Sequence, residues 1–286
     1  MQSSIRKLRL IVQTFAPEIF HWCRSYRLRM RFHAQFGADQ RVFRETFYPP
    51  NTKPSVLTGP FRGMLYLDET VWGPITPKWA GSYEQELEDI IEKMIPSRYD
   101  RIVNLGCAEG YYAVGLALLI ARCEVFAFDV DPFARKQVCR LAELNQVFKR
   151  FHVFGRCSHG RLNELIDGKT LILADIEGDE MGLLDPSRAP NLKEADLLIE
   201  IHEDPGFSGM TKIEEQLTRC FSESHVIERR VSYDRGSWID QHQALWQGKI
   251  SRDRMARALD EARSHSQVWL WARAKPVELP AGKISS

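Results

Sequence analysis

Short apolar runs alternate along the chain with longer segments whose apolar residues recur at helical spacing. The short runs are typical of buried strands, and the longer segments are typical of helices that cover a sheet. Strands are predicted within residues 101–105, 124–131, 151–157, 170–180, 196–204, 225–233 and 267–274, and helices at 111–121, 132–147 and 211–220. The alternation predicts an α/β fold with a doubly wound, mostly parallel seven-stranded sheet.

The beginning of the chain lacks this alternation and is predicted to be a helical N-terminal extension. Residues 5–15 have a helical pattern that Pro17 interrupts. Further on, one helical face carries apolar side chains and another carries arginines: Trp22, Tyr26 and Met30 against Arg24, Arg27 and Arg31. Residues 27–32 also alternate as a strand would, but we expect a helix. The Pro- and Gly-rich residues 47–63 would join this extension to the main domain.

Charge is unevenly distributed along the chain. The whole sequence has 39 Lys and Arg against 38 Asp and Glu, but residues 1–46 contain nine of the former and three of the latter. Their net charge is +6, and the remaining residues carry −5. The simpler interpretation of the basic segment is a solvated helix face. The alternative is an arm that meets an anionic partner, such as nucleic acid.

None of the six cysteines forms a CxxC pair, and several lie in apolar runs. Buried free thiols in a reducing compartment explain this distribution, so we expect a cytoplasmic protein without a structural zinc site. The stretch LIVQTFAPEIF is too short and too interrupted for a secretion signal or a membrane span, which leaves peripheral membrane contact open.

A glycine-containing loop follows the first predicted strand. Small residues there let a ligand approach the backbone, whose free N–H groups would point at an anionic part of it. The dinucleotide fingerprint requires glycine at three positions, which here hold Gly106, Ala108 and Tyr111, so the third position fails. Asp129 ends the second strand, 19 residues after Gly110. A carboxylate there can accept hydrogen bonds from both hydroxyls of an adenosine ribose.

Four motifs occur in order, each at the end of a predicted strand: NLGCAEGYY, FAFDVDP, ADIEGDE and LLIEIHE. Together they resemble class I S-adenosylmethionine-dependent methyltransferases, and most closely the FkbM-type subgroup, whose fourth-strand motif has the form I-D-V-E-G-x-E. The lead-in segments GPFRGMLYL and GSYEQEL also resemble bacterial members of that subgroup. The resemblance covers residues 59–275. It implies a Rossmann-like methyltransferase fold and S-adenosylmethionine as cofactor. We expect the acceptor to be a small-molecule or saccharide hydroxyl, and the resemblance alone suggests the saccharide.

The resemblance also implies which residues hold the cofactor. They are Asn104, Gly106, Cys107, Ala108, Glu109, Gly110, Asp129, Val130, Cys157, Ser158 and Asp175. Asn104 departs from the family, which usually has an acidic residue two positions before the first glycine. An amide cannot offset the positive charge of the cofactor as a carboxylate does. Either Glu109 in the same loop supplies the missing negative charge, or the cofactor site binds more weakly than in the family. Cys157 and Ser158 would contact the adenine or cap a helix.

The ends of the fourth and fifth strands carry the candidate catalytic residues His202, Asp175 and Glu177. A hydroxyl acceptor benefits from a base that takes its proton, and His202 is the most suitable base near neutral pH, with Glu200 beside it to orient the ring. Alternatively, His202 packs against a carbonyl, and Glu177 favours the start of the next helix. Oxygen ligands for a divalent cation are present in the same region, although we predict no metal: Asp175, Glu203 and Asp204.

The predicted domain division has three parts. Residues 1–58 form the basic extension, residues 59–275 the methyltransferase domain, and residues 276–286 a C-terminal tail. Between the last two strands, residues 235–266 form an insert with a predicted helix that Ser251 caps. The tryptophans of this insert, Trp238 and Trp246, either cover the acceptor as part of a lid or anchor the insert on the sheet.

Three functions are compatible with these features. The first is an S-adenosylmethionine-dependent O-methyltransferase, which is the prediction. The second is a nucleic-acid methyltransferase that binds RNA through the basic extension, although the [DN]PP[YF] motif of amino-group base methylases is absent. The third is a non-catalytic module that keeps the methyltransferase fold, which we consider because Asn104 replaces the acidic residue usual in the family.

Overall fold

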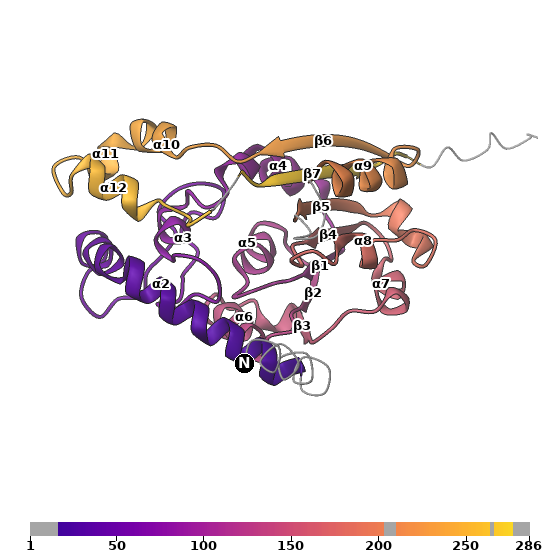
Figure 1. Cartoon of the computed structure of the whole chain (residues 1–286), viewed down its shortest axis with the longest axis horizontal. Helices are drawn as coiled ribbons and strands as arrows, with labels where there is room; N and C mark the ends of the chain where they lie inside the picture. The colour runs from indigo at the N-terminus through magenta and orange to yellow at the C-terminus, as the bar shows by residue number, and fades with distance from the viewer. Residues whose placement is uncertain (1–16, 203–209, 264–265, 277–286) are drawn as a thin grey trace, which may run out of the picture.

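The computed structural model describes residues 17–202, 210–263 and 266–276. A seven-stranded sheet with the order β3-β2-β1-β4-β5-β7-β6 forms its centre (Figure 1). The strands are β1 (Arg101–Leu105), β2 (Glu124–Phe128), β3 (Phe151–Phe154), β4 (Thr170–Ala174), β5 (Asp196–Ile201), β6 (His225–Val231) and β7 (Val268–Ala274). The expected C-terminal tail lies almost entirely outside the described residues.

Strands β1 to β5 are parallel, whereas β7 is antiparallel to both of its neighbours. The register pairs Leu105 at the end of β1 with Phe128 of β2 and with Ala174 of β4. The carboxyl ends of these central strands therefore lie level with one another. Strand order reverses between β1 and β4, which is where ligands bind in doubly wound sheets. The predicted doubly wound, mostly parallel fold is confirmed.

Helices cover both faces of the sheet (Figure 1). The α-helices of the described residues are α2 (Pro17–Phe47), α3 (Thr76–Ala80), α4 (Glu88–Met94), α5 (Tyr111–Leu119), α6 (Pro132–Leu144), α7 (His159–Leu165), α8 (Glu180–Leu183), α9 (Met210–Phe221), α10 (Gly236–Gln241), α11 (Gln243–Trp246) and α12 (Arg252–Ala258). Neighbouring strand residues contribute to opposite core clusters, as Ile102 and Val103 do. Every residue of β4 is buried, which explains why this strand has no polar alternation.

The N-terminal extension contains one long helix. Helix α2 has 31 residues, so the predicted helix is confirmed and the strand-like alternation of residues 27–32 has no counterpart. The helix packs against α6 and α12, which places it along one side of the domain (Figure 1). The helix predicted at residues 5–15 lies outside the described residues. In the described part of the chain, no helix is both long and apolar enough to cross a membrane.

Helices α10, α11 and α12 make up most of the insert between β6 and β7. Ser251 caps α12, because its hydroxyl accepts a hydrogen bond from the backbone N–H of Arg254 at 3.3 Å. Trp238 and Trp246 are buried in the same core cluster. The indole of Trp238 donates to Thr58 Oγ1 at 3.2 Å, and that of Trp246 donates to a backbone carbonyl at 2.9 Å. Trp238 thus ties the insert to Thr58, whereas the acceptor of the Trp246 bond is Ile239 of the insert itself. Both indoles are packed in the core and do not face a ligand.

Candidate active site

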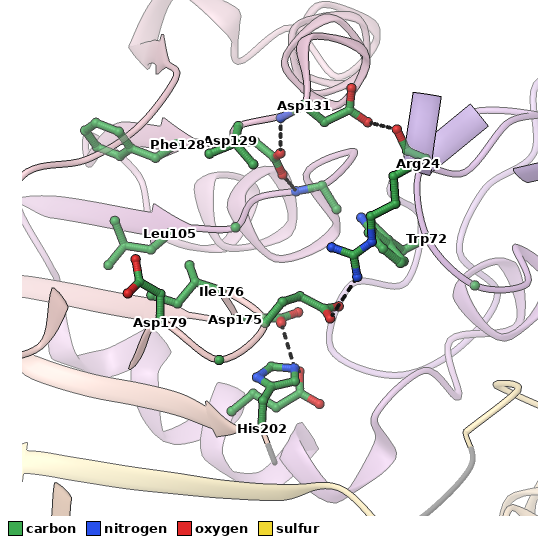
Figure 2. A pocket seen from close by; sticks show the side chains of 18 of the residues that line it. Arg24, Trp72, Leu105, Phe128, Asp129, Asp131, Asp175, Ile176, Asp179 and His202 are labelled. Carbon is green, nitrogen blue, oxygen red and sulfur yellow. Dashed lines mark hydrogen bonds and ion pairs between the residues drawn. The ribbon is translucent and has the colours of Figure 1, made fainter. Parts of the chain in front are cut away.

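A cavity of about 630 Å³ lies at the carboxyl ends of β1, β2, β4 and β5 (Figure 2). Its position coincides with the reversal of strand order, as expected for the ligand site of such a sheet. Loops after the strands supply one part of the wall, α2 supplies a second, residues 72–83 supply a third, and residues 261–263 of the insert supply a fourth. Four regions that are distant in the sequence therefore converge on one site.

The loop after β1 needs glycine for two different reasons. Gly106 has φ +75°, and a Cβ atom on it would overlap the backbone carbonyl of Asp175. Only glycine lets the ends of β1 and β4 approach this closely. Gly110 has φ +95°, and a Cβ atom there would lie 2.7 Å from Cγ2 of Val138 on α6. Gly106 thus shapes the cavity, whereas Gly110 serves helix packing.

The backbone N–H groups of this loop are engaged within the protein. Those of Gly106 and Cys107 donate to the carbonyl of Phe128 at 2.9 and 3.0 Å, and that of Ala108 donates to Asp129 Oδ2 at 2.9 Å. The prediction that free N–H groups point at an anionic ligand is therefore wrong for these three residues. A phosphate-binding loop keeps such groups for its ligand. Their engagement fits a ligand that has no phosphate to bind here.

Asp129 is the carboxylate at the rim of this loop (Figure 2). Besides the Ala108 N–H, it accepts the backbone N–H of Asp131 at 2.8 Å. These two bonds fix its orientation and leave part of its acceptor capacity for a ligand. Burial raises the pKa of Asp129 to about 6, so the group is mostly ionised at neutral pH. An ionised carboxylate in this position is suited to accept the two hydroxyls of a ribose.

Six of the predicted cofactor residues line the cavity: Gly106, Ala108, Asp129, Val130, Cys157 and Asp175. Five others do not: Asn104, Cys107, Glu109, Gly110 and Ser158. Asn104 and Cys107 are buried. Ser158 caps α7 by accepting the backbone N–H of Arg161 at 3.2 Å, so the helix-capping interpretation holds for this residue. The three predicted catalytic residues all line the cavity.

Glu109 is held away from the cavity by other partners. Its buried carboxylate forms an ion pair with Lys78 and accepts hydrogen bonds from Tyr66 Oη at 2.9 Å and from the Val71 N–H at 3.0 Å. Although burial opposes it, the charge of Lys78 lowers the pKa of Glu109 below its usual value. The prediction that Glu109 compensates for Asn104 is therefore wrong, because its charge is already neutralised.

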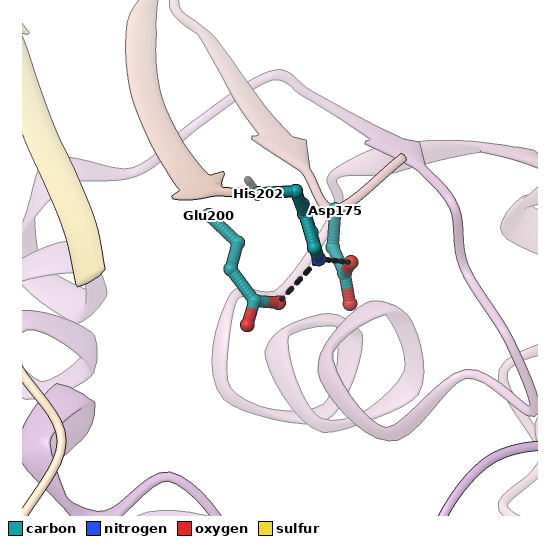
Figure 3. Close-up of side chains that lie close together, drawn as sticks. All are labelled: Asp175, Glu200 and His202. Atoms are coloured by element: carbon teal, nitrogen blue, oxygen red, sulfur yellow. Dashed lines mark ion pairs between the residues drawn. The ribbon is translucent and has the colours of Figure 1, made fainter. Parts of the chain in front are cut away.

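Asp175, Glu200 and His202 meet at the ends of β4 and β5 (Figure 3). His202 Nε2 lies 3.4 Å from Asp175 Oδ1 and 3.7 Å from Glu200 Oε2. On its other side, Nδ1 lies 2.7 Å from Oε1 of the buried Glu180. Glu180, rather than Glu200 as predicted, therefore makes the close contact that orients the imidazole ring.

This carboxylate environment determines the charge of His202. Although burial lowers it, the hydrogen bond to Glu180 and the charge of Asp175 raise the pKa of His202 to about 9. The residue is an imidazolium at neutral pH and has no free lone pair for a proton. The prediction that His202 is the base near neutral pH is therefore not supported by its surroundings. Burial raises the pKa of Asp175 and of Glu200 above the usual values.

The raised pKa of His202 predicts a specific dependence of stability on pH. A histidine whose pKa is higher in the folded state stabilises the protein fully below its unfolded value of about 6.5 and loses this contribution as pH rises through about 9. We expect His202→Gln to lower the free energy of unfolding by on the order of 2 kcal/mol at pH 6, with little difference from wild type at pH 10. Urea unfolding of both proteins across this range measures the difference. An equal loss at both pH values would contradict the imidazolium assignment.

Several cavity residues were not predicted from the sequence. Arg263 from the insert lies 3.2 Å from Glu200 Oε1 and pairs with the buried Glu84. From α2, Arg24 lies 3.7 Å from Glu177 and 5.1 Å from the centre of the Trp72 ring (Figure 2). In the sequence, the end of the insert has several charged residues close together (260–263), and the N-terminal helix has an arginine face. Neither signal indicated which part of the domain those residues would reach.

The cluster of Asp175, Glu200 and His202 also has a spacing that a metal ion could bridge, since one ligand atom of each lies within 4.8 Å of the others. The charges of these carboxylates are already balanced by His202 itself and by Arg263. We therefore derive no metal-dependent step. Glu203 and Asp204, which the sequence offered as further ligands, lie outside the described residues.

No family model matches this chain, and no curated protein matches it by sequence. Its fold is similar to that of a human methyltransferase 10 domain containing protein, with a TM-score of 0.44 at 12% identity over 84% of this chain and 96% of that one. The O-methyltransferase TomG from Streptomyces achromogenes, solved with S-adenosylmethionine, has a TM-score of 0.44 at 9% identity, over 67% and 80% of the two chains.

A putative rRNA methylase from Clostridium thermocellum has a TM-score of 0.41 at 14% identity, covering 65% of this chain and 95% of that one. The strand order and the antiparallel β7 describe the sheet without reference to these structures.

Proposed function

We propose that the chain is an S-adenosylmethionine-dependent methyltransferase that methylates a hydroxyl group of a small molecule or saccharide. One observation carries this proposal: a single cavity contains two sites. Asp129 lies beside the Gly106 loop in one part of the wall, and Asp175 lies with Glu200 and His202 in another. The first is suited to hold an adenosine, and the second to take a proton. Membership in the FkbM-type subgroup, supported by the ADIEGDE motif, is part of the proposal.

The residues present fit the proposed cofactor. Gly106 and Ala108 offer a surface without bulky side chains, Asp129 offers an acceptor for the ribose, and Cys157 lines the same cavity, where it would contact the adenine. The bound cofactor would supply a methyl group already activated by a positively charged sulfur. The carboxylates of the wall complement such a charge, so the absence of an acid at Asn104 does not leave the cavity without negative groups.

Asp175 is the residue best suited to accept the proton of the acceptor. It lines the cavity at the end of β4, and burial raises its pKa toward the range in which a carboxylate is an effective base. The imidazolium of His202 would hold the Asp175 carboxylate in place and limit the rise of its pKa. When the hydroxyl oxygen gains the methyl group, its proton would pass to a carboxylate oxygen of Asp175.

The wall around Asp175 supports a polyhydroxylated acceptor. Trp72 and Tyr83 present aromatic surfaces, against which the C–H face of a sugar can pack. Glu200 and Glu261 present carboxylates that can accept hydrogen bonds from sugar hydroxyls. A saccharide uses both kinds of contact: aromatic packing against its C–H face and hydrogen bonds to its hydroxyls.

A nucleic acid fits the same wall poorly. The cavity wall has more acidic side chains than basic ones: Asp129, Asp131, Asp175, Glu177, Asp179, Glu200 and Glu261 against Arg24, Lys78, Arg156 and Arg263. A polyanion brought to this wall would be repelled. The non-catalytic alternative rests on Asn104, which is buried outside the cavity wall and therefore does not by itself disable the site.

The experiment that tests the proposed function is incubation of the protein with methyl-labelled S-adenosylmethionine and separated cell fractions of glycans, small molecules, lipids and RNA. Label in the glycan or small-molecule fraction, lost with Asp175→Asn, would support the proposal. Label in RNA would establish the nucleic-acid alternative. Binding of the cofactor without transfer to any fraction would establish the non-catalytic one.

A further inference from the structure

Helix α2 carries a line of apolar side chains on its outer surface, which we call the α2 stripe: Ile19, Trp22, Tyr26 and Met30. Their exposed fractions are 60%, 47%, 47% and 52%. Spacings of three and four residues place all four on one helical face. The rings of Trp22 and Tyr26 stack at 5.7 Å, so the middle of the stripe is one aromatic surface.

The α2 stripe is not needed to hold the helix on the domain. That role falls to a different face, from which Phe36 and Phe43 are buried and Ser25 donates to Asp131. Apolar residues of a surface helix ordinarily face the core, and a contiguous apolar patch left exposed indicates an interaction site. The helix thus has one face for the domain and a second face for a partner.

Charge indicates what kind of partner this is. Arg27 and Arg31 are exposed on the adjoining face of α2, and residues 1–46 carry a net charge of +6. An exposed apolar stripe with arginines on the adjoining face of the helix complements the surface of an anionic bilayer, where tryptophan and tyrosine lie at the headgroup level. We propose that the α2 stripe docks the protein on an anionic membrane surface.

Nucleic acid would use only part of this surface. Base stacking requires planar rings, which Trp22 and Tyr26 provide, but it gives no role to the aliphatic ends of the stripe, Ile19 and Met30. Insertion between lipid headgroups uses all four side chains. The membrane surface is therefore the partner that accounts for the whole stripe.

Docking would place the active-site cavity close to the lipid surface. The same part of α2 contributes Arg24, Ser25 and Phe32 to the cavity wall. The helix therefore connects the membrane-facing side of the molecule with the site. Docking itself requires neither cofactor nor acceptor, so its test is independent of the proposed function.

Co-sedimentation of the full chain with vesicles tests the docking. We expect at least about tenfold tighter binding to phosphatidylcholine vesicles that contain phosphatidylglycerol than to phosphatidylcholine alone. The variant Trp22→Ser/Tyr26→Ser/Met30→Ser should bind the anionic vesicles at least about tenfold more weakly. Arg27→Gln/Arg31→Gln should reduce the preference for the anionic vesicles.

Tyr233→Ser is the matched control, because Tyr233 is 48% exposed and follows β6 at the opposite edge of the sheet from β3. It should bind vesicles as the wild type does, and all variants should keep the melting temperature of the wild type. Equal vesicle binding by the triple variant and the wild type would overturn the proposal, as would no vesicle binding at all. RNA binding that the triple variant loses, without vesicle binding, would assign the α2 stripe to nucleic acid.

Discussion

Replacement of Asp175 by asparagine is expected to lower kcat by about 10²–10⁴-fold, the range for loss of a general base. The asparagine keeps the shape of the side chain and an oxygen that can accept a hydrogen bond from His202, but it cannot take a proton. Affinity for S-adenosylmethionine should therefore change by much less than kcat. Steady-state kinetics, together with calorimetric titration of the cofactor, measures both quantities.

Asp179→Asn provides the matched control in the same cavity wall. Asp179 is exposed and pairs with Arg156 at 3.1 Å, so its carboxylate has no assigned part in proton transfer. This variant should keep most of the wild-type kcat. If Asp175→Asn keeps its turnover while His202→Gln loses it, the base is His202 and the assignment to Asp175 is wrong.

Trp238→Ala is expected to lower the free energy of unfolding by about 3–5 kcal/mol, because it removes a fully buried indole and leaves a cavity. The ring of Trp238 stacks on His242 within the insert at 4.4 Å, and its N–H bonds to Thr58, so the substitution weakens the attachment of the insert to the domain core. The melting temperature should fall by roughly 5–15 °C. Differential scanning calorimetry measures this change.

Trp22→Ala is the control for this prediction, since the same substitution on the exposed face of α2 should leave the melting temperature almost unchanged. Trp72 rather than Trp238 lines the cavity, so Trp72→Ala should raise the KM of the acceptor. A Trp238→Ala variant that melts normally but raises the acceptor KM would restore the interpretation of the insert tryptophans as a lid.

The sheet could be predicted from the sequence because its strands are short apolar runs between helices, and β4 is an example in which every residue is buried. The residues that follow β1, β2, β4 and β5 could be placed near one another for the same reason: parallel strands bring their carboxyl ends to one edge. That rule correctly brought Asp129, Asp175 and His202 to one cavity.

Contacts between distant segments could not be predicted in this way. Helix α2 lies beside the site because Ser25 bonds to Asp131, and the insert reaches it because Arg263 bridges Glu84 and Glu200. No local pattern encodes these pairings. The charge of His202 depends on Glu180, whose carboxylate turns back toward β5 from the first residue of α8. Such a contact is set by the tertiary structure alone.

Calorimetric titration of S-adenosylmethionine into the wild type, Asp129→Ala and Asp129→Asn tests the central claim most directly. The wild type should bind the cofactor and its demethylated product more tightly than NADH. Loss of hydrogen bonds to a charged group costs about 1.5–3 kcal/mol, so Asp129→Ala should bind at least about tenfold more weakly, with Asp129→Asn between the two. Unchanged affinity in a folded Asp129→Ala variant, or tighter binding of NADH by the wild type, would contradict the account.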